Sequence, residues 1–112
     1  MEKTAMNNLL YFEYYENKKS GFDTECFIEK YHLDCENKEK TDMFSFLEEV
    51  LEPQERVRFC SWKETLKEKK IDVSTFFFNI KTMQGMLKLT ITMVPIINER
   101  SQEIEYYVGY FS

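Results

Sequence analysis

The sequence predicts an α+β fold: an antiparallel five-stranded sheet with helices packed on one of its faces. Three observations lead to this prediction. Residues typical of a strand come first, helical periodicities occupy the middle of the chain, and a meander of three strands comes last. A length of 112 residues suits one domain, and helices grouped between strands indicate an antiparallel sheet covered on one side.

The first part of the chain predicts a lead-in and two strands. Residues 1–8 show no pattern, so the single domain is expected to span 9–112. The aromatic run LLYFEYYE at 9–16 suits a pleated, half-buried strand. The turn residues NKKSG at 17–21 follow, and a short second strand is expected around Phe22.

The middle of the chain predicts three helices. Apolar residues at i, i+1 and i+4 indicate a short helix at 24–34, and a second helix is expected at 42–51 with Asp42 as its cap. The longest helix is expected at 53–70, where Pro53 stands at a position that needs no backbone N–H. Its apolar stripe consists of Phe59, Trp62 and Leu66.

The last part of the chain predicts strands at 73–81, 86–97 and 103–111, joined by the turns TMQG and NERSQ. In the middle strand one face carries Leu87, Leu89, Ile91 and Met93, and the other carries Lys88, Thr90, Thr92 and Val94. This alternation indicates one buried and one partly wet face. Pro95 cannot donate to a ladder and therefore marks an edge, a bulge or a register break.

The composition excludes several classes of partner. A net charge of −5, with both signs interspersed, argues against nucleic acid and against contact with an anionic membrane. No N-terminal signal sequence and no apolar run of membrane-spanning length are present. The odd number of cysteines does not suit a disulfide framework, so a cytoplasmic location with reduced thiols is expected.

Three stretches of the chain resemble the PAS domain, a small sensor fold of signalling proteins. LLYFEYYEN resembles its first strand, and FSFLEEVLEPQERVRF resembles the segment that leads into its long helix. The residues from 78 to 112 resemble its last three strands, with Gly85, Pro95-Ile96-Ile97 and Val108-Gly109 at the turn, the strand end and the final strand. Glu52 stands where many members carry a histidine before the proline.

The resemblance implies a non-enzymatic sensory or protein-interaction module of a signalling or regulatory protein. It also implies a pocket between the sheet and the helices, where a small apolar ligand could bind. The candidates to line this pocket are Phe27, Tyr31, Phe44, Leu47, Phe59, Trp62, Phe76, Phe78, Leu89 and Ile91. The same residues would serve equally well as a filled core.

The tyrosines of the first and last strands predict an interface. In the fold resembled, these strands are neighbours, and the outer sheet face often forms dimers. Tyrosine is enriched at interfaces because it provides a large contact area at low entropic cost. The interface candidates are Tyr11, Tyr15, Tyr107 and Tyr110. A homodimer or a partner domain of a signalling protein is therefore expected.

Catalysis, metals and cofactors find little support in the sequence. His32 is the only histidine, so it alone could complete a catalytic triad, and a fourth metal ligand beside His32, Cys26 and Cys35 is not evident. The helix at 53–70 offers no axial histidine for haem, and the residues after Cys35 do not match the flavin-binding motif. The glutamates of the helices are expected to be solvated. Two alternatives stay open: a purely structural homodimerisation domain, and a small α+β enzyme or binding protein with a cone-shaped cavity.

Overall fold

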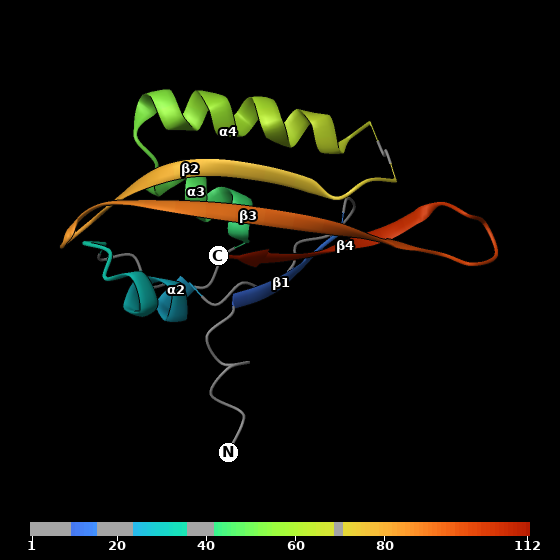
Figure 1. Ribbon diagram of the computed structural model, residues 1–112, viewed down its shortest axis with the longest axis horizontal. Helices are drawn as coiled ribbons and strands as arrows, with labels where there is room; N and C mark the ends of the chain where they lie inside the picture. Colours follow the sequence, from blue (N-terminus) through green and yellow to red (C-terminus); the bar gives the residue numbers. More distant parts are fainter. Residues whose placement is uncertain (1–9, 16–23, 36–41, 69–70) are drawn as a thin grey trace, which may run out of the picture.

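The computed structural model describes residues 10–15, 24–35, 42–68 and 71–112. Its elements are β1 (Leu10–Tyr14), α2 (Thr24–Tyr31), α3 (Met43–Val50), α4 (Pro53–Leu66), β2 (Ser74–Thr82), β3 (Gly85–Ile97) and β4 (Ile104–Phe111). The strands form one antiparallel sheet in the order β1-β4-β3-β2, so the first strand of the chain lies beside the last (Figure 1). The predicted α+β class and the three strands of the final meander are confirmed.

The sheet has four strands in the part of the chain that the structure describes, so the predicted five-stranded sheet is wrong there. The fifth strand is predicted around Phe22, which lies outside the described residues, as do the lead-in 1–8 and the turn at 17–21.

Helix α2 ends at Tyr31, three residues before its predicted end, because His32 leaves the helical conformation. The backbone of His32 has φ 57°, the left-handed geometry that ends many helices. The N–H of Leu33 then donates to the carbonyl of Ile28 at 3.1 Å, and both side chains are buried. The carbonyl of His32 accepts from the N–H of Met83 at 2.8 Å, which fixes the helix end to the β2–β3 turn.

Side-chain contacts cap the start of α3 and join α3 to α4. Asp42 caps α3, accepting from the N–H of Ser45 at 3.0 Å, as the sequence predicts. Arg56 in α4 donates to the carbonyl of Leu51 at 3.0 Å, a group that the end of α3 leaves without a helical partner. The ammonium of Lys63 lies 2.8 Å from the Glu48 carboxylate, and this hydrogen bond raises the pKa of Lys63.

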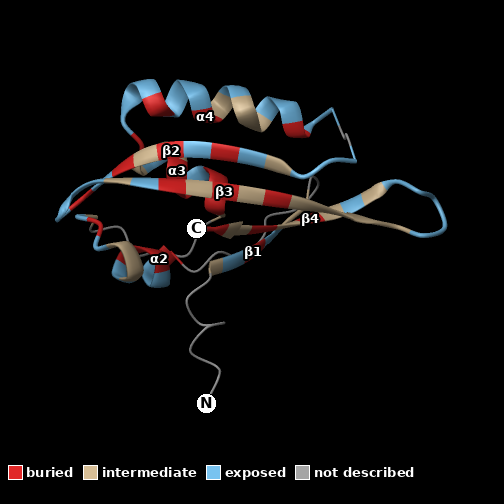
Figure 2. Ribbon diagram, in the orientation of Figure 1, coloured by how far each residue is buried: buried red, intermediate tan, exposed pale blue. Residues whose placement is uncertain are grey.

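The sheet has an inner face, which packs against the helices, and an outer face. In β3 the residues Leu89, Ile91 and Met93 are buried, and the residues between them are half-buried (Figure 2). This confirms the predicted alternation. The β3–β4 register shifts between Ile96 and Ile97, directly after Pro95, where the sequence predicts an irregularity. The hairpin beyond this shift projects past the other strands (Figure 1).

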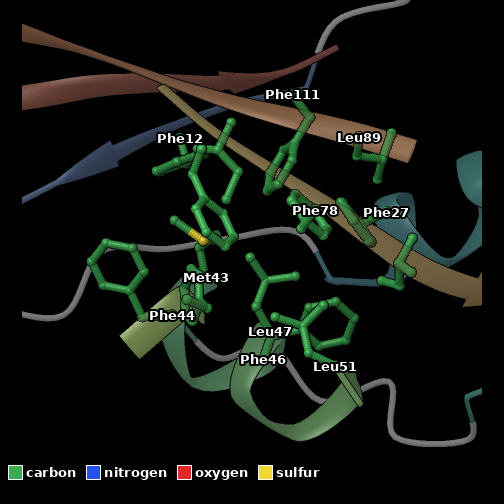
Figure 3. Packing of buried hydrophobic residues seen from close by; sticks show 14 of the residues in the cluster. Phe12, Phe27, Met43, Phe44, Phe46, Leu47, Leu51, Phe78, Leu89 and Phe111 are labelled. Atoms are coloured by element: carbon green, nitrogen blue, oxygen red, sulfur yellow. The ribbon is translucent and has the colours of Figure 1, made fainter. Parts of the chain in front are cut away.

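The core lies between the inner face and the helices, and Phe111 is at its centre. Side chains of the strands point toward those of α3 in Figure 3, where the two sets interdigitate. The ring of Phe111 is fully buried and lies 5.6 Å from Phe12, 4.9 Å from Phe27 and 6.5 Å from Phe78 between ring centroids. One side chain of β4 thus joins β1, β2 and α2.

Replacement of Phe111 by alanine is expected to lower the free energy of unfolding by about 3–5 kcal/mol, because it removes a large buried ring and leaves a cavity. Urea unfolding followed by circular dichroism measures this loss. Phe77→Ala is the matched control, since Phe77 is 66% exposed on the outer face and its loss is expected to cost about 0.5 kcal/mol or less. Equal losses for both variants would contradict the central position of Phe111.

Any side chain larger than hydrogen at position 109 is expected to destabilise the fold, because there is no room for it in the core. An added Cβ would collide with the ring of Phe12 and lie 2.7 Å from the sulfur of Met93. Gly109→Ala should therefore lower the free energy of unfolding by about 1–3 kcal/mol, the usual cost of overpacking a core. The additional change Phe12→Leu should recover part of this loss, because it clears the space. A Gly109→Ala chain as stable as the wild type would show that Phe12 moves aside freely.

Candidate functional site

The ten pocket candidates come together in the structure, and they pack against one another. Eight of them are buried, and Tyr31 and Trp62 are half-buried at the border of the same cluster. Aromatic contacts run through the set: Phe44–Phe59 at 5.5 Å, Phe59–Trp62 at 6.0 Å and Trp62–Phe76 at 5.3 Å between ring centroids. The predicted walls of a pocket are thus in contact with each other.

The indole nitrogen of Trp62 is hydrogen-bonded within the protein. The indole N–H donates to the hydroxyl of Ser74 at 2.8 Å, which joins α4 to the start of β2. A buried tryptophan N–H usually has such a partner. The same N–H is therefore already engaged by a hydroxyl of the protein.

Two of the hollows that described residues line can be compared with the pocket candidates. A hollow of about 260 Å³ lies at the end of α4 and is lined by Thr65, Leu66, Glu68, Asp72, Val73, Ser74 and Tyr107. A second hollow, of about 490 Å³, is lined by Glu55, Arg58, Phe77, Phe78, Asn79, Lys88, Leu89 and Thr90. Of the ten pocket candidates, Phe78 and Leu89 border the second hollow and none borders the first.

The outer face of β1 and β4, together with Tyr15 directly after the end of β1, carries a group of tyrosines that is here called the tyrosine face. Its members are Tyr11, Tyr15, Tyr106 and Tyr110. Tyr11 is 53% exposed and lies 6.4 Å from Tyr110, and Tyr15 stacks on Tyr106 at 4.9 Å between ring centroids. Cross-strand aromatic pairs of this kind stabilise the sheet and also present flat apolar area to the outside.

Tyr107 is not part of this face, although the sequence predicts it as an interface residue. It is buried on the inner face, and its hydroxyl donates to the carbonyl of Leu66 at 3.4 Å. Side chains alternate along β4, so Tyr107 shares its face with Phe111, and Tyr106 shares its face with Tyr110. Tyr106 therefore takes the place that the prediction gave to Tyr107; the parity with Tyr110 was the signal that could have found it.

The tyrosine face includes one acidic group. The hydroxyl of Tyr15 donates to the Glu13 carboxylate at 2.9 Å. This hydrogen bond is the main cause that raises the pKa of Tyr15 above its usual value of 10.0, with smaller contributions from desolvation and from the charge of Glu13. Glu13 is therefore held beside the ring pair of Tyr15 and Tyr106.

Glu55 differs from the solvated glutamate that the sequence predicts. It is 9% exposed, and its carboxylate accepts from the backbone N–H of Asn79 at 3.2 Å and from Arg58 at 2.8 Å. The partner on β2 is 24 residues away, which sequence spacing cannot show.

His32 and the cysteines do not assemble a metal site within the described ranges, where no group of three or more His, Cys, Asp or Glu side chains could hold an ion. The exposed His32 serves instead as the residue that ends α2, one of the readings that its position in the sequence allows. Among the helices that the structure describes, none is long and apolar enough to cross a membrane.

Comparison with known proteins finds a likeness in structure alone. No family model and no curated protein matches the chain. Among solved structures 13 chains match, and one of them is described as "Structure of an RNA-binding Light-Oxygen-Voltage Receptor". The match has a TM-score of 0.54 at 13% sequence identity and covers 94% of this chain but 29% of that chain. Light-oxygen-voltage receptors contain a PAS-family domain, so the match supports the PAS-like fold.

Glu13→Gln is expected to move the pKa of Tyr15 back toward 10, because an amide does not favour the protonated phenol as a carboxylate does. Titration by NMR of chains labelled at the tyrosine ring carbons measures this shift, with a Tyr15→Phe spectrum to assign the signal. Glu103→Gln, at the exposed tip of the β3–β4 hairpin, should leave the titration unchanged. An unaltered pKa in Glu13→Gln would contradict the hydrogen bond.

Proposed function

We propose that this chain is a non-enzymatic PAS-like module that binds another protein through the tyrosine face, as part of a signalling or regulatory protein. The observation that carries the proposal is the pairing of four tyrosines on the outer face of two adjacent strands, away from the core. We propose that the tyrosine face binds the tyrosine face of a second copy of this chain. The alternative partner is another domain of a signalling protein.

The chemistry of the tyrosine face suits protein rather than nucleic acid. Tyrosine rings provide contact area and a hydroxyl at low entropic cost, and they are frequent among residues that dominate binding energy. The half-buried Val108 lies between the two ring pairs, and the half-buried Val94 is its partner on β3, so both extend the apolar area. Glu13 adds a negative charge there, whereas a nucleic-acid site would need a basic surface.

The similar solved structure binds RNA, according to its description, and this property belongs to a chain of which the present one spans 29%. The net charge of −5 favours a different partner here, since phosphate contacts provide most of the affinity for nucleic acids. The absence of nucleic-acid binding and a cytoplasmic location therefore stay predictions. The sensory class of the neighbour supports a regulatory rather than an enzymatic module.

A small apolar ligand between the sheet and the helices is the second candidate function, as the PAS-like fold makes it conceivable. The packing of the ten pocket candidates against one another weighs against it, and so does the use of the Trp62 N–H by Ser74. The absence of haem and flavin stays a prediction, which rests on the lack of an axial histidine at 53–70 and on the residues after Cys35. We therefore place the function on the surface of the sheet.

Tyr106→Ala is expected to weaken self-association by at least about tenfold, or about 1.4 kcal/mol, because it removes one ring of the stacked pair in the tyrosine face. Sedimentation velocity over a concentration series measures the association constant. Met83→Ala is the control, since Met83 is 67% exposed but lies in the β2–β3 turn. Equal association of the wild type and Tyr106→Ala would contradict the proposal, and so would a wild type that stays monomeric and retains no partner through this face.

A further inference from the structure

Strand β2 lies at the edge of the sheet and carries a segment that favours pairing with another strand. It bonds to β3 along one side, from Ser74 to Thr82, and no strand that the structure describes lies on its other side. Residues 75–80 read TFFFNI, which is rich in aromatic and β-branched residues and contains no charge, proline or glycine. Segments of this composition at an open sheet edge tend to add a strand from another molecule.

Two side chains of α4 occupy this edge. Arg58 donates from Nη2 to the carbonyl oxygen of Phe77 at 3.0 Å, and Glu55 accepts from the backbone N–H of Asn79 at 3.2 Å. Groups along a strand point alternately to its two sides, so the groups of Phe77 and Asn79 that these side chains bind point away from β3. They are an acceptor and a donor that a neighbouring strand would use.

Glu55 and Arg58, here called the edge clamp, also hold each other. Their side chains are 2.8 Å apart at i, i+3 spacing, so both extend from the side of α4 that faces β2. The Arg58 guanidinium lies 5.0 Å from the centroid of the Phe76 ring. Figure 1 shows α4 running alongside β2, which is the position from which the clamp reaches the edge. Hydrogen bonds that involve charged groups are the stronger ones, so the clamp competes with an incoming strand.

We propose that the free edge of β2 is a latent docking surface for a second copy of this chain, and that the edge clamp keeps it closed in the monomer. The segment is self-complementary: antiparallel pairing about a two-fold axis at Phe77 sets Phe77 against its own copy and Thr75 against Asn79. No like charges meet in this core of the pairing, and Phe77 is already 66% exposed. Aromatic pairs across strands stabilise such a ladder.

This surface is distinct from the tyrosine face. The strand order β1-β4-β3-β2 places β2 at the opposite end of the sheet from β1, and an edge pairs through backbone groups rather than through an outer face. The inference therefore does not depend on the proposed function, and each can fail alone.

Opening the clamp tests the inference. In Arg58→Ala, and in the milder Glu55→Gln, the association constant measured by sedimentation velocity is expected to rise at least about tenfold over the wild type. The side chain of Arg58 is 52% exposed, so its truncation leaves the core intact, which near-UV circular dichroism verifies. The matched control is Arg56→Ala, which also removes a bond from an arginine of α4 to a carbonyl, but to Leu51 rather than to β2. Association of the control as strong as that of Arg58→Ala would overturn the inference.

A second substitution identifies the surface through which the Arg58→Ala chain self-associates. Phe77→Lys added to Arg58→Ala should return association to the wild-type level, because the two-fold pairing would bring two lysines together on the edge strand. A folded Arg58→Ala chain that associates no more than the wild type would overturn the inference. So would association that persists with Phe77→Lys, or that is abolished by Tyr106→Ala instead, since either would assign it to another surface.

Discussion

The packing of Phe111 against β1, β2 and α2 is the interaction on which the rest of the fold depends. Its backbone pairs with Leu10 of β1 on one side and with Ile91 of β3 on the other, so this residue of β4 connects both neighbouring strands. Its ring lies among Phe12, Phe27 and Phe78, which come from distant parts of the chain. Because protein interiors are close-packed, this contact fixes how the helices can lie on the sheet.

The division of side chains between the core and the outer face determines where the described part of the molecule can interact with others. Side chains along each strand point alternately to the two faces of the sheet. Those on the inner face pack against the helices in the core cluster. The remaining aromatic residues of β1 and β4 gather on the outer face, where Tyr11 and Tyr110 pair as do Tyr15 and Tyr106. At the other end of the sheet, the edge clamp closes β2. The tyrosine face is thus partly exposed, whereas outward backbone groups of β2 are bound by Glu55 and Arg58.

Much of this fold follows from local patterns. The final meander, the cap at Asp42, the apolar stripe of α4 and the irregularity beside Pro95 are all confirmed, because each depends on periodicity or on one residue's backbone preference. The face of Tyr107 and the burial of Glu55 were not predicted correctly. They depend on which strand or helix lies opposite, and the partners Leu66 and Asn79 are 41 and 24 residues away.

For the candidate sites, too, local patterns predict which residues lie together but not how they pack. Apolar periodicity predicts that the ten pocket candidates face the interior, and they lie in or beside the core cluster. Periodicity alone cannot distinguish a filled core from a lined cavity. That distinction depends on side-chain volumes across α2, α3 and the sheet, such as the contact of Phe27 with Phe46 at 5.5 Å. The tyrosine face could be found from the alternation within β4 once the neighbouring strand was known to be β1.

The central claim is that this PAS-like module acts through its sheet surface and fills its interior with its own side chains. Native mass spectrometry of the purified chain, followed by denaturing mass spectrometry of the same sample, tests it most directly. We expect only the mass of the polypeptide and of its dimer under native conditions. A co-purified small molecule that leaves on denaturation would contradict the claim and would assign the function to the interior.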